Sequence, residues 1–400
     1  MLMYASFYIK GVREIAPFNF LETNTMSHSI ENSNNTLTAL MERVKNDAAR
    51  KADFLTPTND LIKVTDPDTK RPALVIEAKG GEPTRHLDIN SVAFQQLAAH
   101  CDIETRTARR LQDHYPAEFD TLINAHFQKE PKRKMLRTFL DTDETNGTAR
   151  ALLSDRFKTY DNNDMLQTVL PSIMENDSQL QVVQANISDS KLYMRFKSLV
   201  HTGAGANVAD IMANGVGFSN SETGQGSVTA YQLFWTLACL NGMQTENKTR
   251  SSHITSARDS DDWGLLSGEA QEADNRALNL KLRDLVEAYS SREMFDEVLE
   301  KMKAAAADTI EGEFSVADTV NNLGTVMRLT KKETSNVLDG LMSTIGQAGY
   351  ENHRPLSRAT FINAVTAAGN KCDIDQTDDY QRLGGRLFNI APKDWNRIAA

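Results

Sequence analysis

The spacing of hydrophobic positions switches between strand-like and helical along the first third of the chain. A short apolar run at 73–78 ends at Gly80-Gly81 and predicts a strand. Apolar positions three or four residues apart then predict three successive helices, at 90–100, 104–113 and 116–127. The connection between the first two is very short, which predicts a helical hairpin.

The region from about 148 to 245 mixes both spacings. Runs of alternating or continuous apolar residues predict four strands, at 151–160, 180–187, 191–199 and 211–219. Helical spacing predicts two helices, at 163–175 and at 229–240, the second ending before Asn241-Gly242. Because the second and third strands form a hairpin around Ser188-Asp189-Ser190, we expect a mainly antiparallel sheet backed by helices.

From about residue 262 the pattern is almost entirely helical. Leu278, Leu282, Leu285 and Tyr289 share one helix face. Capping boxes begin two later helices, at Ser315 with Asp318 and at Thr330 with Glu333, and the last helical patterns lie at 361–368 and 383–390. The expected fold class is α+β. It comprises a flexible N-terminal segment 1–60, a small helix-turn-helix-like region 61–140, a central α+β domain 141–250 and a mainly helical region 251–400.

The N-terminal residues have neither a signal-peptide pattern nor a membrane-spanning one. Lys10, Arg13 and Glu14 interrupt the mildly apolar segment 1–25, and no run of eighteen apolar residues occurs in the chain. Met26 begins a polar stretch, so we expect translation to start there and 26–60 to be largely flexible, with a short helical pattern around Leu37 and Val44. Polar residues at 244–261 predict a linker or an exposed loop.

Composition points to a globular protein in a reducing compartment. The chain has 400 residues, of which 40% are hydrophobic, and its three cysteines lie far apart at Cys101, Cys239 and Cys372. We therefore expect a soluble cytoplasmic protein with no membrane partner. The net charge of -10 is concentrated at 259–313, which holds fifteen Asp or Glu and six Lys or Arg.

Several motifs in order along the chain resemble a known family. They are Ala151-Leu152-Leu153-Ser154-Asp155-Arg156-Phe157 with Asp161-Asn162, Gly215-Val216-Gly217-Phe218-Ser219-Asn220-Ser221-Glu222, a predicted helix at 236–243, Asn363-Ala364-Val365-Thr366 and Arg382-Leu383-Gly384-Gly385. With the hairpin near 94–111, the chain from about 85 to 390 resembles the phage/plasmid-like proteins that carry the uncharacterised domain of unknown function nine-three-two. The resemblance implies a mobile genetic element in the bacterial host cytoplasm and a role in DNA maintenance, recombination or host conflict, but no catalytic residues.

The helical hairpin at 95–111 is the first candidate for nucleic-acid binding. Arg106, Arg109 and Arg110 are three and four residues apart, so they lie on one side of the second helix. Arginines there could reach phosphates or guanine edges in a major groove. Asp102 occupies the position of the usual turn glycine and adds a carboxylate. A plain helical hairpin remains the favoured alternative.

The second candidate is a face of the expected sheet. On the strand 151–160, Arg156, Lys158 and Tyr160 alternate, and so do Tyr193, Arg195 and Lys197 on the strand 191–199. Cations that contact the backbone and rings that stack on bases are the combination that single-strand binders use. An ordinary solvated face of an antiparallel sheet has the same pattern.

The remaining motifs are less specific. The basic run 129–137, with Lys132, Arg133 and Lys134, suits either a phosphate clamp or a solvated connector. The glycines around 203–226 match neither dinucleotide nor Walker patterns, and serve turns and bulges instead. Acidic clusters at 161–164 and 373–378 lack the pattern of a calcium loop. We therefore expect no cofactor, no metal site and no catalytic residues.

The sequence favours a non-enzymatic DNA-handling protein of a mobile element. It would bind single-stranded DNA through the two strand faces, with the hairpin arginines and the basic run as a second set of contacts, and would assist annealing or recombination as an oligomer. The alternative is an interaction protein that counters a host defence protein through the acidic helices of 259–313. A metal-dependent nuclease ranks third.

Overall fold

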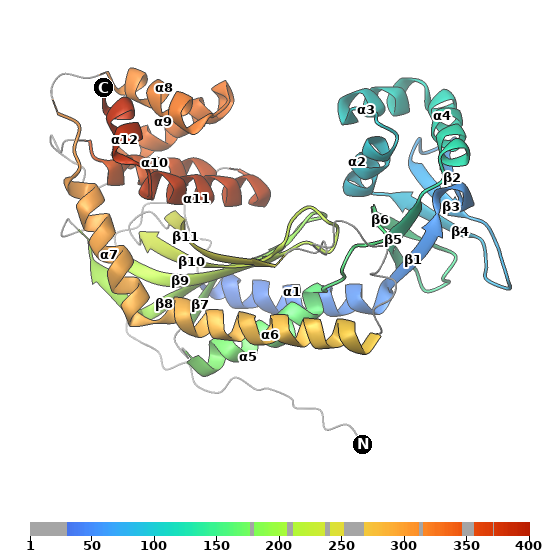
Figure 1. The fold of residues 1–400 in the computed structure, drawn as a ribbon, viewed down its shortest axis with the longest axis horizontal. Coiled ribbons are helices and arrows are strands. Elements are labelled where there is room, and N and C mark those ends of the chain that lie inside the picture. The colour runs from blue at the N-terminus through green and yellow to red at the C-terminus, as the bar shows by residue number, and fades with distance from the viewer. Residues whose placement is uncertain are drawn as a thin grey trace.

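The protein is a mixed α+β structure with two sheets and twelve α-helices in the residues that can be described (Figure 1). The computed structural model describes residues 30–176, 180–205, 211–236, 241–251, 268–311, 315–345, 356–370 and 372–400. This confirms the expected fold class, including the helical C-terminal region. The start at Met26 and the behaviour of residues 1–29 lie outside the described residues.

The first sheet has six strands in the order β1-β5-β6-β4-β3-β2. Its strands are β1 (Lys51–Pro57), β2 (Leu61–Thr65), β3 (Pro72–Ile76), β4 (Arg85–Ile89), β5 (Arg133–Leu140) and β6 (Asn146–Ser154). All neighbours are antiparallel except β4 and β6. The helices α2 (Ser91–His100), α3 (Thr105–His114) and α4 (Pro116–Lys129) form a layer beside it. Leu74, Leu87 and Leu136 of the sheet pack against Leu97 and Phe119 of these helices.

The second sheet is an antiparallel meander in the order β11-β10-β9-β8-β7. Its strands are β7 (Leu180–Ile187), β8 (Leu192–Ala204), β9 (Ile211–Asn220), β10 (Val228–Thr236) and β11 (Asn241–Ser251). The expected hairpin of β7 and β8 around Ser188-Asp189-Ser190 is confirmed.

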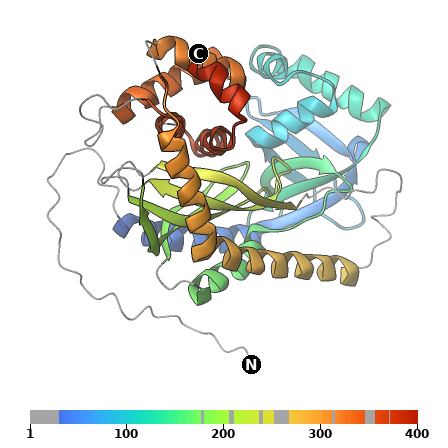
Figure 2. The ribbon, with the colours of Figure 1, turned by 60° about the vertical axis from the view of Figure 1, so that its left-hand side comes forward.

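Helices cover both faces of the second sheet. On one face lie α1 (Ile30–Arg50), α5 (Asn162–Asn176) and α6 (Gly268–Ser290), whose apolar side chains pack on Met194, Phe196 and Phe218. On the other lie α10 (Arg358–Gly369) and α11 (Ile374–Phe388). Figures 1 and 2 show α1, α5 and α6 below the second sheet and the lobe of α8–α12 above it, while the lobe of α2–α4 lies over the first sheet.

The C-terminal helices share one large apolar core. They are α7 (Arg292–Ala307), α8 (Val316–Met327), α9 (Lys331–Ile345), α10, α11 and α12 (Pro392–Ala399). Phe295, Leu323, Leu341 and Phe361 are among the buried side chains of this core. Both expected capping residues are confirmed, since Ser315 Oγ accepts from the Asp318 N–H and Thr330 Oγ1 from the Glu333 N–H.

Of the predicted elements of the central region, one strand is confirmed only in part and one helix is wrong. The strand expected at 151–160 ends at Ser154, because a turn follows in which Ser154 accepts from the N–H groups of Arg156 and Phe157. The helix expected at 229–240 is strand β10 up to Thr236, and its β-branched and aromatic residues favour that state. Residues 237–240 lie outside the described part.

Two predicted flexible segments are ordered where they are described. Residues 30–60 are expected to be largely flexible apart from a short helical pattern around Leu37 and Val44. That helix is confirmed but is longer, since α1 spans Ile30–Arg50 and is followed by β1, and Leu40 and Val44 are buried against the second sheet. The expected linker 244–261 belongs to β11 as far as Ser251.

The first sheet also crosses the expected domain boundary at residue 140, because β6 is one of its inner strands. Among the described helices, none is long and apolar enough to cross a membrane.

We predict that Gly385→Ala destabilises the protein by about 1–3 kcal/mol, the usual cost of overpacking. A Cβ atom at Gly385 would lie 1.8 Å from the backbone oxygen of Gln244, so α11 would have to move off β11. The measurement is urea unfolding followed by circular dichroism. Ser343→Ala, an exposed change on α9, is the control and should alter the free energy of unfolding by less than about 0.5 kcal/mol. Equal stability of both variants would contradict the close approach of α11 to β11.

Candidate nucleic-acid interface

The six residues expected to form a sheet platform do not share an exposed face. Tyr160 lies beyond β6, is buried, and donates from its hydroxyl to Asn279 Oδ1 at 2.7 Å. Arg156 lies in the turn after β6, and Lys158 pairs with Asp274 of α6. The expected alternation of these three residues on a strand is therefore wrong.

On β8 the expected alternation is present, but its polar face is buried. Tyr193 and Arg195 are both 0% exposed, and Lys197 is half-buried. The Tyr193 hydroxyl donates to Asp375 Oδ1 of α11 at 2.8 Å, and burial raises the pKa of this phenol. Because α11 covers this face, neither a base-stacking platform nor the alternative solvated face describes it.

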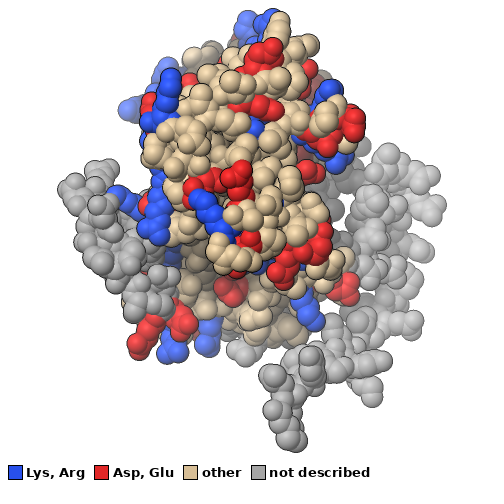
Figure 3. All heavy atoms as spheres, turned by 90° about the vertical axis from the view of Figure 1, so that its right-hand side faces the viewer, with Lys and Arg blue, Asp and Glu red and all other residues tan. Residues whose placement is uncertain are grey.

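The second set of expected residues is more accessible. Arg106, Arg109 and Arg110 are exposed on α3. Lys132 and Arg133 are exposed where β5 begins, and Lys134 is half-buried. On the side of the molecule occupied by the first sheet, cations and carboxylates are interspersed rather than gathered into one basic area (Figure 3).

A buried carboxylate, Asp378 of α11, organises the covered face of β8. Its Oδ1 accepts from Arg195 Nη2 at 2.9 Å and from Gln244 Nε2 at 2.5 Å, and its Oδ2 accepts from Arg382 Nε at 2.9 Å. Burial opposes ionisation of Asp378, but Arg195 and Arg382 hold its pKa below the ordinary value. The guanidinium of Arg195 also bonds to Gln184 of β7.

A groove of about 620 Å³ opens next to this cluster, between α9, α11 and β11. Its floor contains Met327, Leu383 and Tyr380, whose hydroxyl accepts from Asn336 Nδ2 at 2.9 Å and so links α11 to α9. The charged side chains that line it are Arg328, Lys332, Arg382, Arg386, Glu333 and Asp379. Cations therefore outnumber carboxylates two to one.

The cations of the groove are held in defined ways. Arg328, Lys332 and Arg386 are exposed, whereas Arg382 is fixed from below by Asp378. Arg328 ends α8 in the left-handed region at φ 60°, which costs a non-glycine residue on the order of 1–2 kcal/mol. Glu333 is occupied at the N-terminus of α9, where it accepts from Thr330, and these hydrogen bonds lower its pKa.

Sequence reasoning did not single out these groove residues as a site. Arg382 and Arg386 have the i, i+4 spacing that puts both on one side of α11. Lys332 follows the capping Thr330 and so lies in the first turn of α9. These signals are visible in the sequence, but nothing in it brings α9 and α11 together.

A second, polar cleft of about 470 Å³ lies between the two lobes. Ser91 and Gln95 of α2, Asp189 and Lys191 of the β7–β8 turn, and Asp375 of α11 line it. Asp375 already accepts from the hydroxyls of Ser190 and Tyr193. With two carboxylates against one lysine, this cleft is less suited to a phosphate than the groove.

An ion cluster joins the two sheets. Arg137 of β5 is 0% exposed and donates to Asp53 Oδ1 at 3.1 Å, Asp161 Oδ1 at 2.7 Å and the Glu222 carbonyl at 3.0 Å. Arg150 of β6 pairs with Glu222 Oε2 at 2.7 Å. Burial opposes ionisation of Glu222, but Arg150 and Arg137 lower its pKa.

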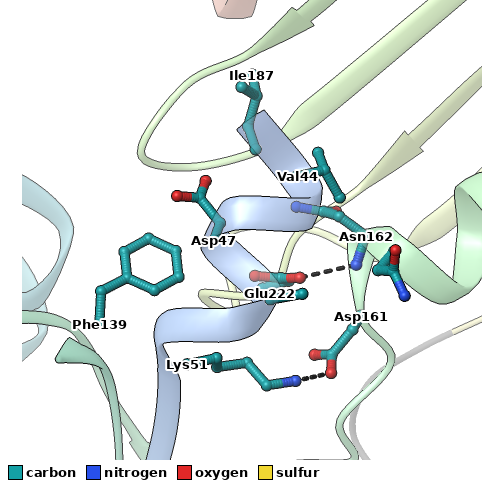
Figure 4. A pocket seen from close by; sticks show the side chains of 10 residues that line it. Val44, Asp47, Lys51, Phe139, Asp161, Asn162, Ile187 and Glu222 are labelled. Atoms are coloured by element: carbon teal, nitrogen blue, oxygen red, sulfur yellow. Dashed lines mark hydrogen bonds and ion pairs between the residues drawn. The ribbon is translucent and has the colours of Figure 1, made fainter. Parts of the chain in front are cut away.

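Figure 4 shows the edge of this cluster from close by. Lys51 points to Asp161, and the Glu222 carboxylate accepts from the Asn162 N–H at 2.7 Å. The adjacent cavity of about 10 Å³ holds at most about one water molecule. This cluster therefore connects the sheets and leaves no room for a ligand.

Each of the two acidic clusters, 161–164 and 373–378, has an aspartate that pairs with cationic side chains of the protein itself. Asp161 pairs with Lys51 and Arg137, and Asp378 with Arg195 and Arg382. Within the described ranges, no three His, Cys, Asp or Glu side chains are placed to hold a metal ion together.

Comparison with known proteins gives no relative from which a role could be transferred. No protein-family model, curated protein or solved structure matches the chain.

We predict that Asp378→Asn destabilises the protein by about 3–5 kcal/mol near neutral pH, since it leaves the buried Arg195 without a counter-charge. The pKa of Asp378 in the folded protein is below its ordinary value, so the stabilisation is present above that ordinary value and disappears as the pH falls through the lower, folded pKa. Urea unfolding of both proteins across the acid range tests this.

Asp379→Asn is the matched control for this prediction. The neighbouring Asp379 side chain is 74% exposed and lies 3.7 Å from Arg382. Its loss should change the free energy of unfolding by less than about 0.5 kcal/mol. If Asp378→Asn and Asp379→Asn had equal effects, the buried cluster would not stabilise the position of α11.

Proposed function

We propose that this chain is a DNA-handling protein of a phage or plasmid that binds single-stranded DNA in the groove between α9 and α11. In this role it assists annealing or recombination as an oligomer, without itself cutting or joining strands. The groove replaces the strand faces as the proposed site. The observation that carries the proposal is the lining of Arg328, Lys332, Arg382 and Arg386 around one concave surface.

The electrostatics of the lining favour a phosphate ligand there. Lys332 in the first turn of α9 and Arg386 on α11 are exposed and line the same groove, whereas the N-terminus of α9 itself is already capped by Glu333. Arg382 is positioned by Asp378, so part of the cost of ordering a phosphate-binding side chain is met by the fold. The aromatic ring on the floor, Tyr380, is buried, so the groove suits backbone contacts better than base stacking.

The width of the groove favours a single strand over a duplex. Both α9 and α11 pack on α10, so their axes are at most about 20 Å apart. A helix with its side chains is about 10–12 Å across. The gap between the two helix surfaces is therefore at most on the order of 10 Å, and a duplex, which is wider than its own major groove of roughly 12 Å, does not fit into it. An extended strand fits this space.

The rival function as an acidic interaction surface has less support. On α7, Glu297 pairs with Lys301 and Glu300 with Lys303, so carboxylates alternate with cations along this helix. A mixed surface of this kind does not imitate the uniform charge of DNA. The rival predicts no DNA binding near physiological salt, and predicts that charge reversal in 259–313 abolishes function.

We predict that replacing Arg328, Lys332 and Arg386 together by Gln weakens single-strand binding. It should also reduce the salt slope of log K by about 0.7 for each phosphate that the variant no longer neutralises. Arg382 is left unchanged because it contacts Asp378. Fluorescence anisotropy of a labelled oligothymidylate, titrated at several salt concentrations, measures both quantities.

The matched control replaces Arg292, Lys301 and Lys303 of α7 by Gln, which removes the same charge outside the groove. It should leave the salt slope near the wild-type value. Tyr160→Phe should also bind as the wild type does, because its hydroxyl faces Asn279 in the interior. If the wild-type protein does not bind single-stranded DNA at low salt in any oligomeric state, the proposed function is refuted.

A further inference from the structure

We propose that α2 and α3 form a duplex-DNA docking element, with Arg106, Arg109 and Arg110 of α3 contacting phosphates and base edges in the major groove. This surface lies on the other lobe from the single-strand groove, and the inference does not depend on the proposed function. A protein with both surfaces could hold a duplex and a single strand at once.

The turn between α2 and α3 has the geometry that a helix-turn-helix needs. Asp102 has φ 54° and lies directly after the end of α2, where glycine is usual. The Ile103 N–H donates to the Ala98 carbonyl at 2.9 Å, and the Asp102 N–H to the Ala99 carbonyl at 3.2 Å. This is a Schellman motif, which closes α2, and the four residues 101–104 redirect the chain into α3.

The second helix is anchored on one side only. Its buried residues are Ala108 and Gln112, and Gln112 Oε1 accepts from the buried Lys63 Nζ at 2.7 Å. Lys63 in turn pairs with Asp120 of α4. Figure 1 shows α3 at the top of its lobe, on the far side of α2 from the sheet. A helix held rigidly from below with an open outer face can enter a groove.

The open face of α3 carries the arginines. All three are exposed, and none makes an ion pair with a described residue. Arg109 lies with its guanidinium carbon 5.9 Å from the Phe94 ring centroid, which orients this side chain without neutralising it. Charges of both signs are interspersed on this lobe, but the outer face of α3 has three exposed arginines against one exposed carboxylate, Asp113, and this excess of positive charge complements the phosphates that line a major groove. Duplex DNA is therefore the occupant that this face fits.

The first test replaces Arg106, Arg109 and Arg110 together by Gln and measures binding to a blunt duplex by anisotropy. Duplex affinity should fall, and the salt slope should decrease by about 0.9 for each phosphate that the variant no longer neutralises. Binding to the oligothymidylate should stay at the wild-type level. The α7 triple variant, with Arg292, Lys301 and Lys303 replaced by Gln, is the charge-matched control and should bind duplex normally.

The second test removes a negative charge and keeps the turn. Asparagine tolerates the left-handed region, so Asp102→Asn should preserve the fold while it relieves repulsion of the phosphates. We expect duplex binding about two- to fivefold tighter, as for one unit of charge near a phosphate at low salt. This gain of function remains informative if the arginine variant fails to fold.

Each result has a defined meaning. Loss of duplex binding in the α3 variant but not in the α7 variant, together with a gain in Asp102→Asn, supports the docking element. Equal losses in the α3 and α7 variants, unchanged or weaker duplex binding of Asp102→Asn, or no duplex binding by the wild type would overturn it. Failure of single-strand binding alone would refute the groove and leave this proposal standing.

Discussion

The arrangement of the second sheet depends on one buried charge, the guanidinium of Arg195 in the middle of β8. A cation without water around it is costly unless a partner of opposite charge and further hydrogen bonds replace the solvent. Asp378 supplies that partner from α11, and Gln184 and Tyr231 bond to the same guanidinium. The charge of Arg195 is therefore compensated only when α11 packs on the sheet. Residues far apart in sequence thus form one structural unit.

The same requirement explains why the polar face of β8 could not be placed from the sequence. Alternation of Tyr193, Arg195 and Lys197 with apolar residues predicts a period of two, and β8 has that period. Such a pattern normally means one wet face. Whether a polar face meets water or a helix depends on partners elsewhere in the chain, and here Asp375 and Asp378 lie more than 180 residues away.

Local chemistry predicts many of the elements, and non-local contacts decide the rest. The hairpin of β7 and β8, the helices α2 to α4 and the cap at Ser315 follow from spacing and capping residues. The helical prediction for β10 is wrong although Tyr231, Phe234 and Trp235 favour a strand. The Tyr231 ring packs where Gly217 has no side chain, since a Cβ atom at Gly217 would lie 2.2 Å from the ring. This contact depends on how β9 and β10 pair, and the spacing of residues along one strand does not reveal that pairing.

The groove is a consequence of the cluster beneath it. Asp378 binds Arg195 with one carboxylate oxygen and Arg382 with the other, so the group that holds α11 on the sheet also orients a cation of the groove. Neutralising Asp378 would therefore release α11 and Arg382 together, and weaker DNA binding in such a variant would say nothing specific about the groove. Arg328, Lys332 and Arg386 stand outside this cluster. Only they can separate phosphate binding from stability, because their charges are exposed and their removal leaves no buried group unpaired.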